Sequence, residues 1–201
     1  MTVPCGRRLG PALEALTLFE SGKTLDAAVG ASLTDSRMRP ALQAVLYDLT
    51  RRYFLCDCLV QFLSARPPTD NVRRILMLAL SELLLYPTKR FALVNETVNF
   101  AKANRKTSAA SGFVNACLRR FCRESDALVA EAMKNDIVRL NAPEWLLKKF
   151  SQDLGRTDAE ALLKLAQIPP RLVLRVNRRK TTPLAWCNLA QEKGLTALAL
   201  G

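Results

Sequence analysis

Histidine is absent from the 201 residues, and this absence excludes several kinds of chemistry. Neither a Ser-His-Asp triad nor a Cys-His pair can be built, and no histidine is present to serve as a general base or metal ligand. Glycine is also scarce, with eight residues, and neither G-x-x-x-x-G-K-[ST] nor G-x-G-x-x-G occurs. The sequence therefore contains no recognisable loop for the phosphates of a nucleotide cofactor.

Long hydrophobic runs are missing as well. The most apolar stretch, residues 75–86, is about half as long as the ~20 residues that a membrane-spanning helix needs, and Ser81 and Glu82 interrupt it. Arg7 and Arg8, near the amino terminus, are not followed by the apolar segment of a secretory signal. We therefore expect a cytoplasmic protein without a membrane partner.

The cysteines follow no disulfide or metal-binding pattern. Two pairs lie close along the chain, two and five residues apart, and neither has the C-x-x-C spacing of a zinc knuckle. We interpret them as small, reduced, mostly buried thiols and expect no metal site. The six cysteines are Cys5, Cys56, Cys58, Cys117, Cys122 and Cys187.

Acidic residues are outnumbered, and the net charge is +12. The excess is spread along the chain, with 19 basic and 12 acidic residues up to Lys134 and 11 basic and 6 acidic residues after it. A folded protein with this charge attracts polyanions, of which nucleic acid is the usual one. A basic surface without any partner is the alternative interpretation.

Apolar residues recur at three- and four-residue steps from about Leu9 to Lys134, which predicts a domain made only of helices. Residues 75–84 are apolar on nearly every side, so their helix is expected at the centre of the bundle. Thr24, Asp70 and the pair Thr34-Asp35 are expected helix caps. The expected helices are 9–21, 24–31, 34–66 as one long helix or two nearly continuous ones, 70–86, 92–104, 108–122 and a weaker 125–135.

The pattern changes near Asn135. Asn141-Ala-Pro143 is typical of a helix start, and Asp158 begins another helix. Residues 171–177 alternate in the manner of a strand, a helix follows from Thr182-Pro183 to Gly194, and 195–201 has the pattern of a second strand that is cut off. We predict a mainly α protein: a helical bundle over residues 1–134, and a small incomplete α/β subdomain over 135–201.

Basic residues gather at particular helix ends and along one helix face. Asn115, Arg119 and Arg123 are four residues apart, so they share a face. Phe113 and Phe121 lie on the apolar stripe of the same helix and are expected in the core, which favours recognition of RNA backbone or shape over base stacking. The predicted RNA contacts are Arg7, Arg8, Arg51, Arg52, Arg73, Arg74, Lys102, Arg105, Lys106, Asn115, Arg119, Arg120, Arg123, Arg175, Asn177, Arg178 and Arg179.

Arginine outnumbers lysine, and its planar guanidinium group suits phosphate. Arginines at a helix carboxyl end also stabilise the helix dipole without any ligand, by ~0.3–1 kcal/mol each. That alternative does not apply to Arg73 and Arg74, which lie at the start of a helix.

Several longer motifs add a family resemblance. RRILMLALSELLLY at 73–86, VNETV at 94–98 and GFVNACLRRF at 112–121 resemble NusB-like domains, in particular the version at the front of bacterial 16S rRNA cytosine-5 methyltransferases. NAPEWLLK at 141–148 and PPRLVLRVN at 169–177 are similar to the segment that follows in those enzymes. Before the helix that contains Val94-Asn95-Glu96, the family tends to have proline-histidine, whereas this chain has Arg90-Phe91.

The resemblance implies a helical RNA-binding domain and the first part of an RNA-facing α/β subdomain. Its implied partners are 16S ribosomal RNA and possible components of the small ribosomal subunit. It also implies a remainder with an S-adenosylmethionine-binding sheet and two catalytic cysteines, one after proline and one in Thr-Cys-Ser. None of the six cysteines has either setting, Cys187 included, so this chain is expected to hold no cofactor and to be inactive alone.

Two other functions remain open from the sequence. A free-standing transcription antitermination factor would bind RNA and a ribosomal protein, but it should end near residue 140. An enzyme that is active as it stands is the other alternative.

Overall fold

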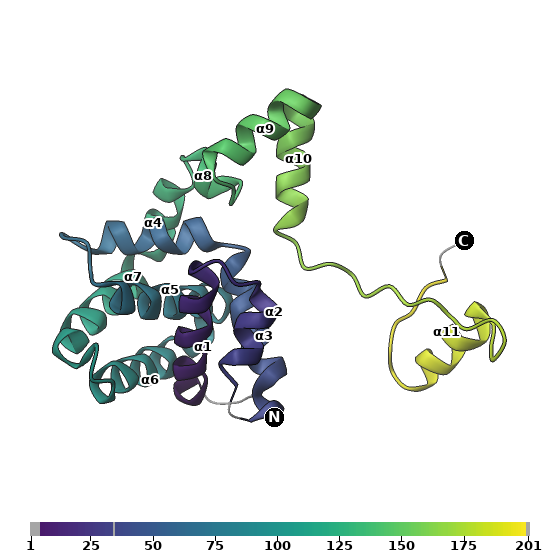
Figure 1. Cartoon of the computed structure of the whole chain (residues 1–201), viewed down its shortest axis with the longest axis horizontal. Helices are drawn as coiled ribbons and strands as arrows, with labels where there is room; N and C mark the ends of the chain where they lie inside the picture. The colour runs from purple at the N-terminus through teal and green to yellow at the C-terminus, as the bar shows by residue number, and fades with distance from the viewer. Residues whose placement is uncertain (1–4, 34, 200–201) are drawn as a thin grey trace. The chain divides into compact units, whose positions relative to one another are not determined.

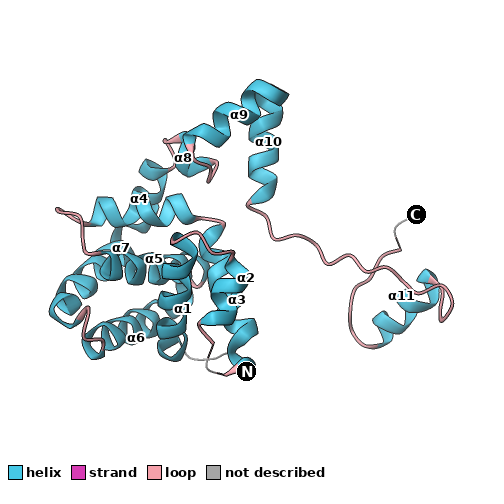
Figure 2. Ribbon diagram, in the orientation of Figure 1, coloured by secondary structure: helices cyan, strands magenta, loops and turns pink. Residues whose placement is uncertain are grey.

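The computed structural model of the chain describes residues 5–33 and 35–199, with side chains from Arg7 onward (Figure 1). Thr34 and the side chain of Cys5 lie outside the described residues. Within them the regular elements are helices and no strand forms (Figure 2). The helices are α1 (Cys5–Glu20), α2 (Leu25–Ala31), α3 (Arg39–Thr50), α4 (Tyr53–Leu63), α5 (Asp70–Leu85), α6 (Arg90–Ala103), α7 (Ser111–Ala132), α8 (Asp136–Arg139), α9 (Glu144–Leu154), α10 (Arg156–Ala166) and α11 (Pro183–Glu192).

The chain forms two compact units, one ending at Ile168 and the other beginning at Pro169. Each is described by itself below. The division of the sequence into domains at residue 134 stays a prediction. No helix among the described residues is both long enough and apolar enough to cross a membrane.

Helix α5 forms the centre of the first unit, as its apolar sequence predicts. Ile75, Leu76, Leu78 and Leu80 are fully buried, and α1, α3, α4, α6 and α7 pack around α5 (Figure 1). Because this helix is covered on every side, even Ser81 and Glu82 are buried. The mainly α fold class is confirmed.

The long segment predicted from residue 34 to 66 is two helices, broken at Arg51 and Arg52. The side chain of Asn141 forms hydrogen bonds with backbone groups on both sides of the break. Its Nδ2 donates to the carbonyl oxygen of Thr50 at 2.8 Å, and its Oδ1 accepts from the amide of Phe54 at 3.2 Å. Asn141 adopts a left-handed backbone, with φ 48°, which asparagine tolerates better than most residues.

The prediction that Asn141 caps the next helix is therefore wrong. Pro143 occupies the position before α9 and forms no side-chain cap. The side-chain amide of Asn141 is instead hydrogen-bonded to Phe54 and Thr50, which lie 87 and 91 residues earlier in the chain. Asp70 is likewise the first residue of α5, with Thr69 before it, so it is not the cap residue. Thr24 and Thr182 do cap their helices, accepting from the amides of Ala27 and Ala185.

Helix α7 continues through the predicted boundary at residue 122. It bends at Glu124, whose φ of −116° and ψ of 15° are not helical, and the predicted weaker helix forms the second part of α7. Phe121 is buried as predicted, but Phe113 is 37% exposed, because it lies near the edge of the face that packs on α4.

A smaller core joins α8, α9 and α10. Leu140, Ala142, Leu147 and Leu163 are buried there, with Leu146 and Phe150 packed against them. Gly155, with φ 80°, allows α10 to begin one residue after α9 ends. These helices pack on the bundle mainly through the contact of α8 with α4.

The second unit differs from its predicted α/β pattern. The predicted strand at 171–177 is an extended segment without pairing, and the part of 195–201 that is described forms no strand either. A strand is stabilised by ladder hydrogen bonds and side-chain pairs with a neighbour, and the described residues provide none here. Helix α11 forms as predicted.

Candidate nucleic-acid interface

The predicted RNA-contact residues divide into those with acidic partners and those without. Among those with acidic partners, Arg73 on α5 forms three side-chain hydrogen bonds. It donates from Nε to Asp57 at 2.6 Å, from Nη1 to Glu20 at 3.0 Å and from Nη2 to the hydroxyl of Tyr53 at 3.0 Å. The neighbouring Arg74 donates from Nε to the same Glu20 at 2.7 Å.

This network joins α1, α4 and α5, and its charges depend on one another. Burial raises the pKa of Glu20, but the hydrogen bonds from Tyr53, Arg74 and Arg73 outweigh it, so the pKa lies below its ordinary value. Burial and the hydrogen bond to Glu20 raise the pKa of Tyr53. Glu20 is therefore ionised at neutral pH and holds both arginines.

Three further predicted arginines also have intramolecular partners. Arg8 forms an ion pair with the buried Glu82 at 3.0 Å. Arg51 lies 3.7 Å from Asp48. Arg120 donates to Glu124 at 2.9 Å and to the carbonyl oxygen of Phe62 at 3.2 Å. Arg52 is half-buried, and its Nη1 has no hydrogen-bond partner in the described structure.

The remaining basic residues among the predicted contacts of the first unit are exposed and form no ion pair within the described residues. One of them, Arg7, lies on α1. The other five lie on α6, on the loop after it and along α7, and we call them the α6–α7 corner. Lys102, Arg105 and Lys106 lie where α6 ends. Arg119 and Arg123 lie at the ninth and thirteenth positions of α7, and Arg123 is next to Cys122, whose carbonyl oxygen accepts from Arg90 at the start of α6.

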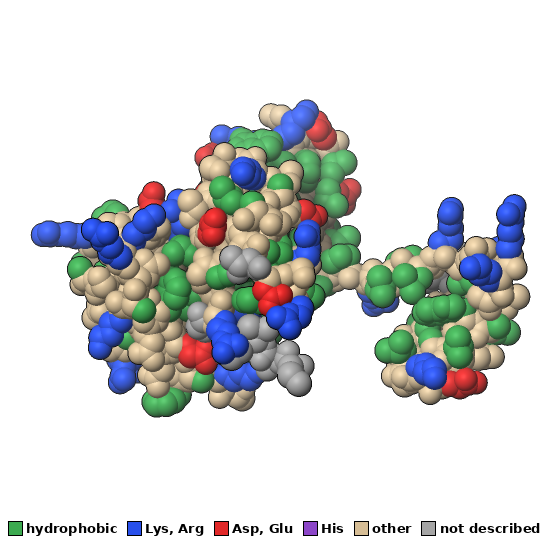
Figure 3. Space-filling model, turned by 60° about the horizontal axis from the view of Figure 1, so that its bottom comes forward, with side chains coloured by type: hydrophobic (Ala, Val, Ile, Leu, Met, Phe, Trp, Pro, Cys, Tyr) green, Lys and Arg blue, Asp and Glu red, His purple; other side chains and the backbone are tan. Residues whose placement is uncertain are grey.

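The local fold holds this corner in place. Thr107 is buried between the two helices, and its hydroxyl donates to the carbonyl oxygen of Ala101 at 3.0 Å. On α7, Asn115 accepts from Nε of Arg119 at 3.0 Å, so it orients that guanidinium group. Figure 3 shows one face of the molecule, on which Lys and Arg side chains stand at several places, with Asp and Glu side chains among them.

Cations gathered in this way repel one another. Arg119 and Arg123 are four residues apart on one helix, a rise of about 6 Å. Two unit charges at that distance repel by about 0.7 kcal/mol even in water. A sugar-phosphate chain relieves this repulsion, because it brings closely spaced negative charges and releases its own counterions. Anion binding is what the corner is suited to.

In the second unit, Arg175, Arg178 and Arg179 are exposed and have no ion pair among the described residues. The side chain of Asn177 accepts from the amide of Arg179 at 3.0 Å, which shapes the turn after the extended segment. Whether any of the predicted contacts touches RNA stays a prediction.

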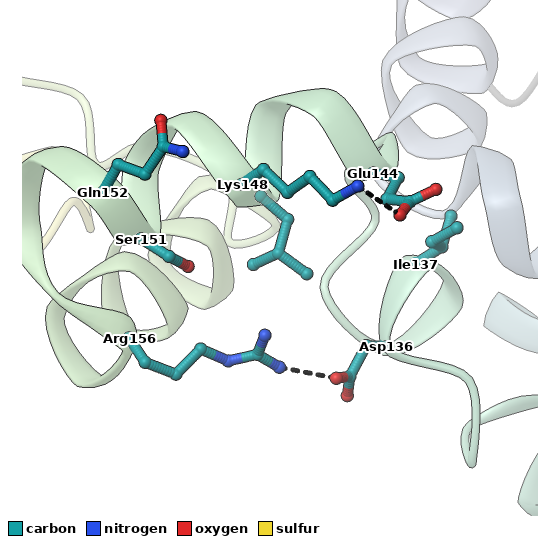
Figure 4. Close-up of a pocket in the computed structure, with 8 residues that line it drawn as sticks. Asp136, Ile137, Glu144, Lys148, Ser151, Gln152 and Arg156 are labelled. Atoms are coloured by element: carbon teal, nitrogen blue, oxygen red, sulfur yellow. Dashed lines mark hydrogen bonds and ion pairs between the residues drawn. The ribbon is translucent and has the colours of Figure 1, made fainter.

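A pocket that was not predicted from the sequence lies between α8, α9 and α10 (Figure 4). It has a volume of about 500 Å³, and its charged side chains already face one another. Asp136 pairs with Arg156, and Lys148 with Glu144. On α10, hydrogen bonds from Arg139 and Arg156 lower the pKa of Glu160 to about 2.

These residues do not fit S-adenosylmethionine. A dinucleotide-type site has a glycine-rich turn between a strand and a helix, and the described residues contain no strand. The pocket's carboxylates are neutralised by cations from the same chain, so they are not available to a ligand. The described residues also contain no group of three or more potential metal ligands.

Comparison with known proteins gives the chain a context. Residues 12–123 match the model of the NusB family, and residues 142–200 match that of the RsmF/B-like methyltransferase ferredoxin-like domain. A probable ribosomal RNA small subunit methyltransferase B from Synechocystis is 33% identical over 78% of this chain and 36% of its own length. The ribosomal RNA small subunit methyltransferase B of Pseudomonas putida is 31% identical over 94% of this chain and 44% of its own length. The chain therefore spans less than half the length of these relatives.

Proposed function

Because the chain belongs to the NusB family, with a methyltransferase ferredoxin-like segment after it, we propose that it binds ribosomal RNA of the small subunit. In this proposal it is the docking part of a cytosine-5 methyltransferase, and the methyl transfer takes place in a separate catalytic part. The observation that carries the proposal is the α6–α7 corner, five exposed cations that no carboxylate of the described chain neutralises.

The contacts would be made mainly to phosphate. A guanidinium group forks onto phosphate oxygens, and such contacts fix position without reading sequence. Phe113, at the start of α7, is 37% exposed and could stack on one base, but the five cations favour recognition of backbone and shape. Arg73 and Arg74 would hold α5 to α1 through Glu20 rather than leave Glu20 for a phosphate.

S-adenosylmethionine and the catalytic cysteines would belong to the catalytic part. Cys56 and Cys117 are poor nucleophiles because they are buried, and burial raises the pKa of Cys56 to about 12. We expect the purified chain to transfer no labelled methyl group from S-adenosylmethionine to ribosomal RNA.

The free-standing antitermination factor is the weaker alternative. It leaves residues 142–200 without a role, whereas the match of this segment to a methyltransferase domain gives them one. If the chain bound a ribosomal protein as well as ribosomal RNA, without any methyltransferase part, the alternative would gain support.

The proposal can be tested with two variants of equal charge. Replacing Lys102, Arg105 and Lys106 by glutamine should weaken binding of a 16S rRNA fragment at least about tenfold, since one charged hydrogen bond contributes ~1.5–3 kcal/mol. The control replaces three exposed lysines that are already paired with carboxylates: Lys134, Lys148 and Lys149. Equal loss of affinity in both variants, measured by fluorescence anisotropy, would show that only net charge matters and would contradict the proposal.

A further inference from the structure

The bend of α7 at Glu124 has no cause in the composition of α7 itself. Helices bend sharply at proline, at glycine-serine pairs, or where a side chain takes over a bond of the backbone ladder. Helix α7 contains no proline, and its Ser111-Gly112 pair lies at its start, far from the bend. The cause is therefore a side chain that packs against α7.

Arg90, the first residue of α6, reaches the bend. Its Nη1 donates to the carbonyl oxygen of Cys122 at 3.1 Å, and its Nη2 donates to the hydroxyl of Ser125 at 3.2 Å. These two acceptors lie on either side of Glu124 in the sequence. Nε of Arg90 is buried without a hydrogen-bond partner, so the guanidinium group is inserted against α7 rather than lying in solvent. Arg90 thus engages the backbone of α7 where its regular geometry breaks.

The charges beside the bend are not paired as a regular helix would pair them. Arg123 and Asp126 are three residues apart, and side chains at that spacing are neighbours on a regular helix. One turn earlier such a pair does form, since Arg120 donates to Glu124 at 2.9 Å. Asp126 instead accepts from the hydroxyl of Ser125 at 3.2 Å. Within the described residues neither Arg123 nor Asp126 forms an ion pair.

A chain of two hydrogen bonds therefore runs from Arg90 through Ser125 to Asp126. Arg123 lies close to the same place. Burial raises the pKa of the Cys122 thiol, and the charges of Arg90 and Arg123 oppose this rise, so both cations are near Cys122. Asp126 thus has two arginines in its neighbourhood, and the hydrogen bonds direct it to Arg90. This arrangement leaves Arg123 unpaired.

We propose that Arg90 is a positioning residue of the RNA surface: it bends α7 and holds Asp126 through Ser125, so that Arg123 stays available to phosphate. Without Arg90, α7 would straighten and Asp126 would pair with Arg123, which removes one cation from the α6–α7 corner. The effect on RNA rests on the proposed function, whereas the cause of the bend does not depend on RNA.

The first measurement needs no RNA. Arg90→Met removes the guanidinium donors and keeps an unbranched apolar side chain at the start of α6. We expect the Cα chemical shift of Glu124 to move toward the value of a regular helix. An unchanged shift would mean that the bend has another cause, and it would overturn the proposal.

The second measurement is the salt dependence of binding to a 16S rRNA fragment. In Arg90→Met the log–log slope should become shallower by about 0.7, the value of one lost phosphate contact. The affinity should fall about tenfold, the effect of one charged hydrogen bond. Ser125→Ala removes a single hydroxyl group and leaves the net charge unchanged, so it should fold as before. It cuts the link to Asp126 and should change the slope in the same direction by a smaller amount.

Two double variants with the net charge of the unmodified chain separate positioning from charge. Arg90→Met with Asp126→Asn should restore the slope, because no carboxylate then competes for Arg123. The matched control is Arg90→Met with Glu131→Gln, which removes another carboxylate of α7, 59% exposed and paired with Lys134. It should keep the shallower slope. Equal slopes in the two double variants would overturn the proposal.

The positioning role and the proposed function fail in different ways. If the unmodified chain does not bind the fragment, the proposed function fails and the effect on RNA with it. A shift of the Glu124 signal in Arg90→Met would still show that Arg90 holds the bend. If the unmodified chain binds the fragment and Arg90→Met binds it with the same slope, the positioning role is overturned and RNA binding stands.

Discussion

Asn141 stabilises a distant part of the fold. Its amide group ends α3 and begins α4, and its backbone is left-handed, with φ 48°. We expect Asn141→Ala to lower the free energy of unfolding by about 2 kcal/mol or more, because a backbone group left without a partner costs ~1–3 kcal/mol. Urea unfolding measures this.

A second variant separates the two causes. Asn141→Gly loses the same hydrogen bonds but tolerates the positive φ, so it should be less destabilised than the alanine variant. Equal urea midpoints for Asn141→Ala and the unmodified chain would show that the amide contributes nothing.

Glu20 makes the stability of the bundle depend on pH. Its folded pKa lies below the ordinary value of 4.5, so its contribution is present above that pH and is lost as the pH falls toward the folded pKa. Glu20→Gln should therefore be less stable than the unmodified chain near neutral pH, and the difference should shrink as the pH falls from about 5 to about 3. Thermal unfolding at several pH values checks this, and a difference that does not change with pH would disprove it.

At the scale of single elements, α5 is the helix on which the bundle depends most. Leu76 is fully buried, so Leu76→Ala should lower the free energy of unfolding by ~2–5 kcal/mol. Leu184→Ala on α11, where the side chain is exposed, should change it by less than about 0.5 kcal/mol. Similar losses in both variants, measured by urea unfolding, would contradict the central position of α5.

Helices with a strong apolar period were predictable, and breaks between them were not. The apolar repeat of residues 34–66 continues across Arg51 and Arg52, because it indicates only which face of a helix is buried. It does not indicate that the distant Asn141 forms a hydrogen bond with the end of α3. Glu124 likewise bends α7 without ending it. The pattern at 171–177 shows the preference of a strand, but pairing also requires a neighbour that the pattern does not provide.

The candidate site was predictable in its residue types but not in its pairing. From the sequence alone, Arg73 and Arg119 are equally good candidates for RNA contacts, because both lie on predicted helices. Only the fold shows that Glu20, 53 residues before Arg73, reaches it, while no carboxylate of the described chain reaches Arg119. Ion pairs between distant segments depend on tertiary packing, which periodicity does not report.

At the scale of the whole molecule, the basic residues that give the net charge of +12 have two roles. Arginines on α5 hold helices together, whereas those of the α6–α7 corner face solvent. We therefore expect Arg119→Gln with Arg123→Gln to leave the free energy of unfolding within about 0.5 kcal/mol of the unmodified chain. Arg73→Gln, which leaves Asp57 without its cation and Glu20 with Arg74 alone, should destabilise it more. Urea unfolding of the two proteins side by side distinguishes them, and the reverse order would contradict this division.

The salt dependence of RNA binding tests the central claim most directly. If the five corner cations contact phosphates of a single-stranded 16S rRNA segment, the logarithm of the binding constant should fall with the logarithm of salt concentration with a slope of about −3.5, roughly −0.7 per contact. Replacing all five by glutamine should make the slope shallower by about that amount, roughly 0.7 for each lost contact. A slope that is the same in both proteins, or close to zero in the unmodified chain, would show that the corner does not bind the RNA backbone.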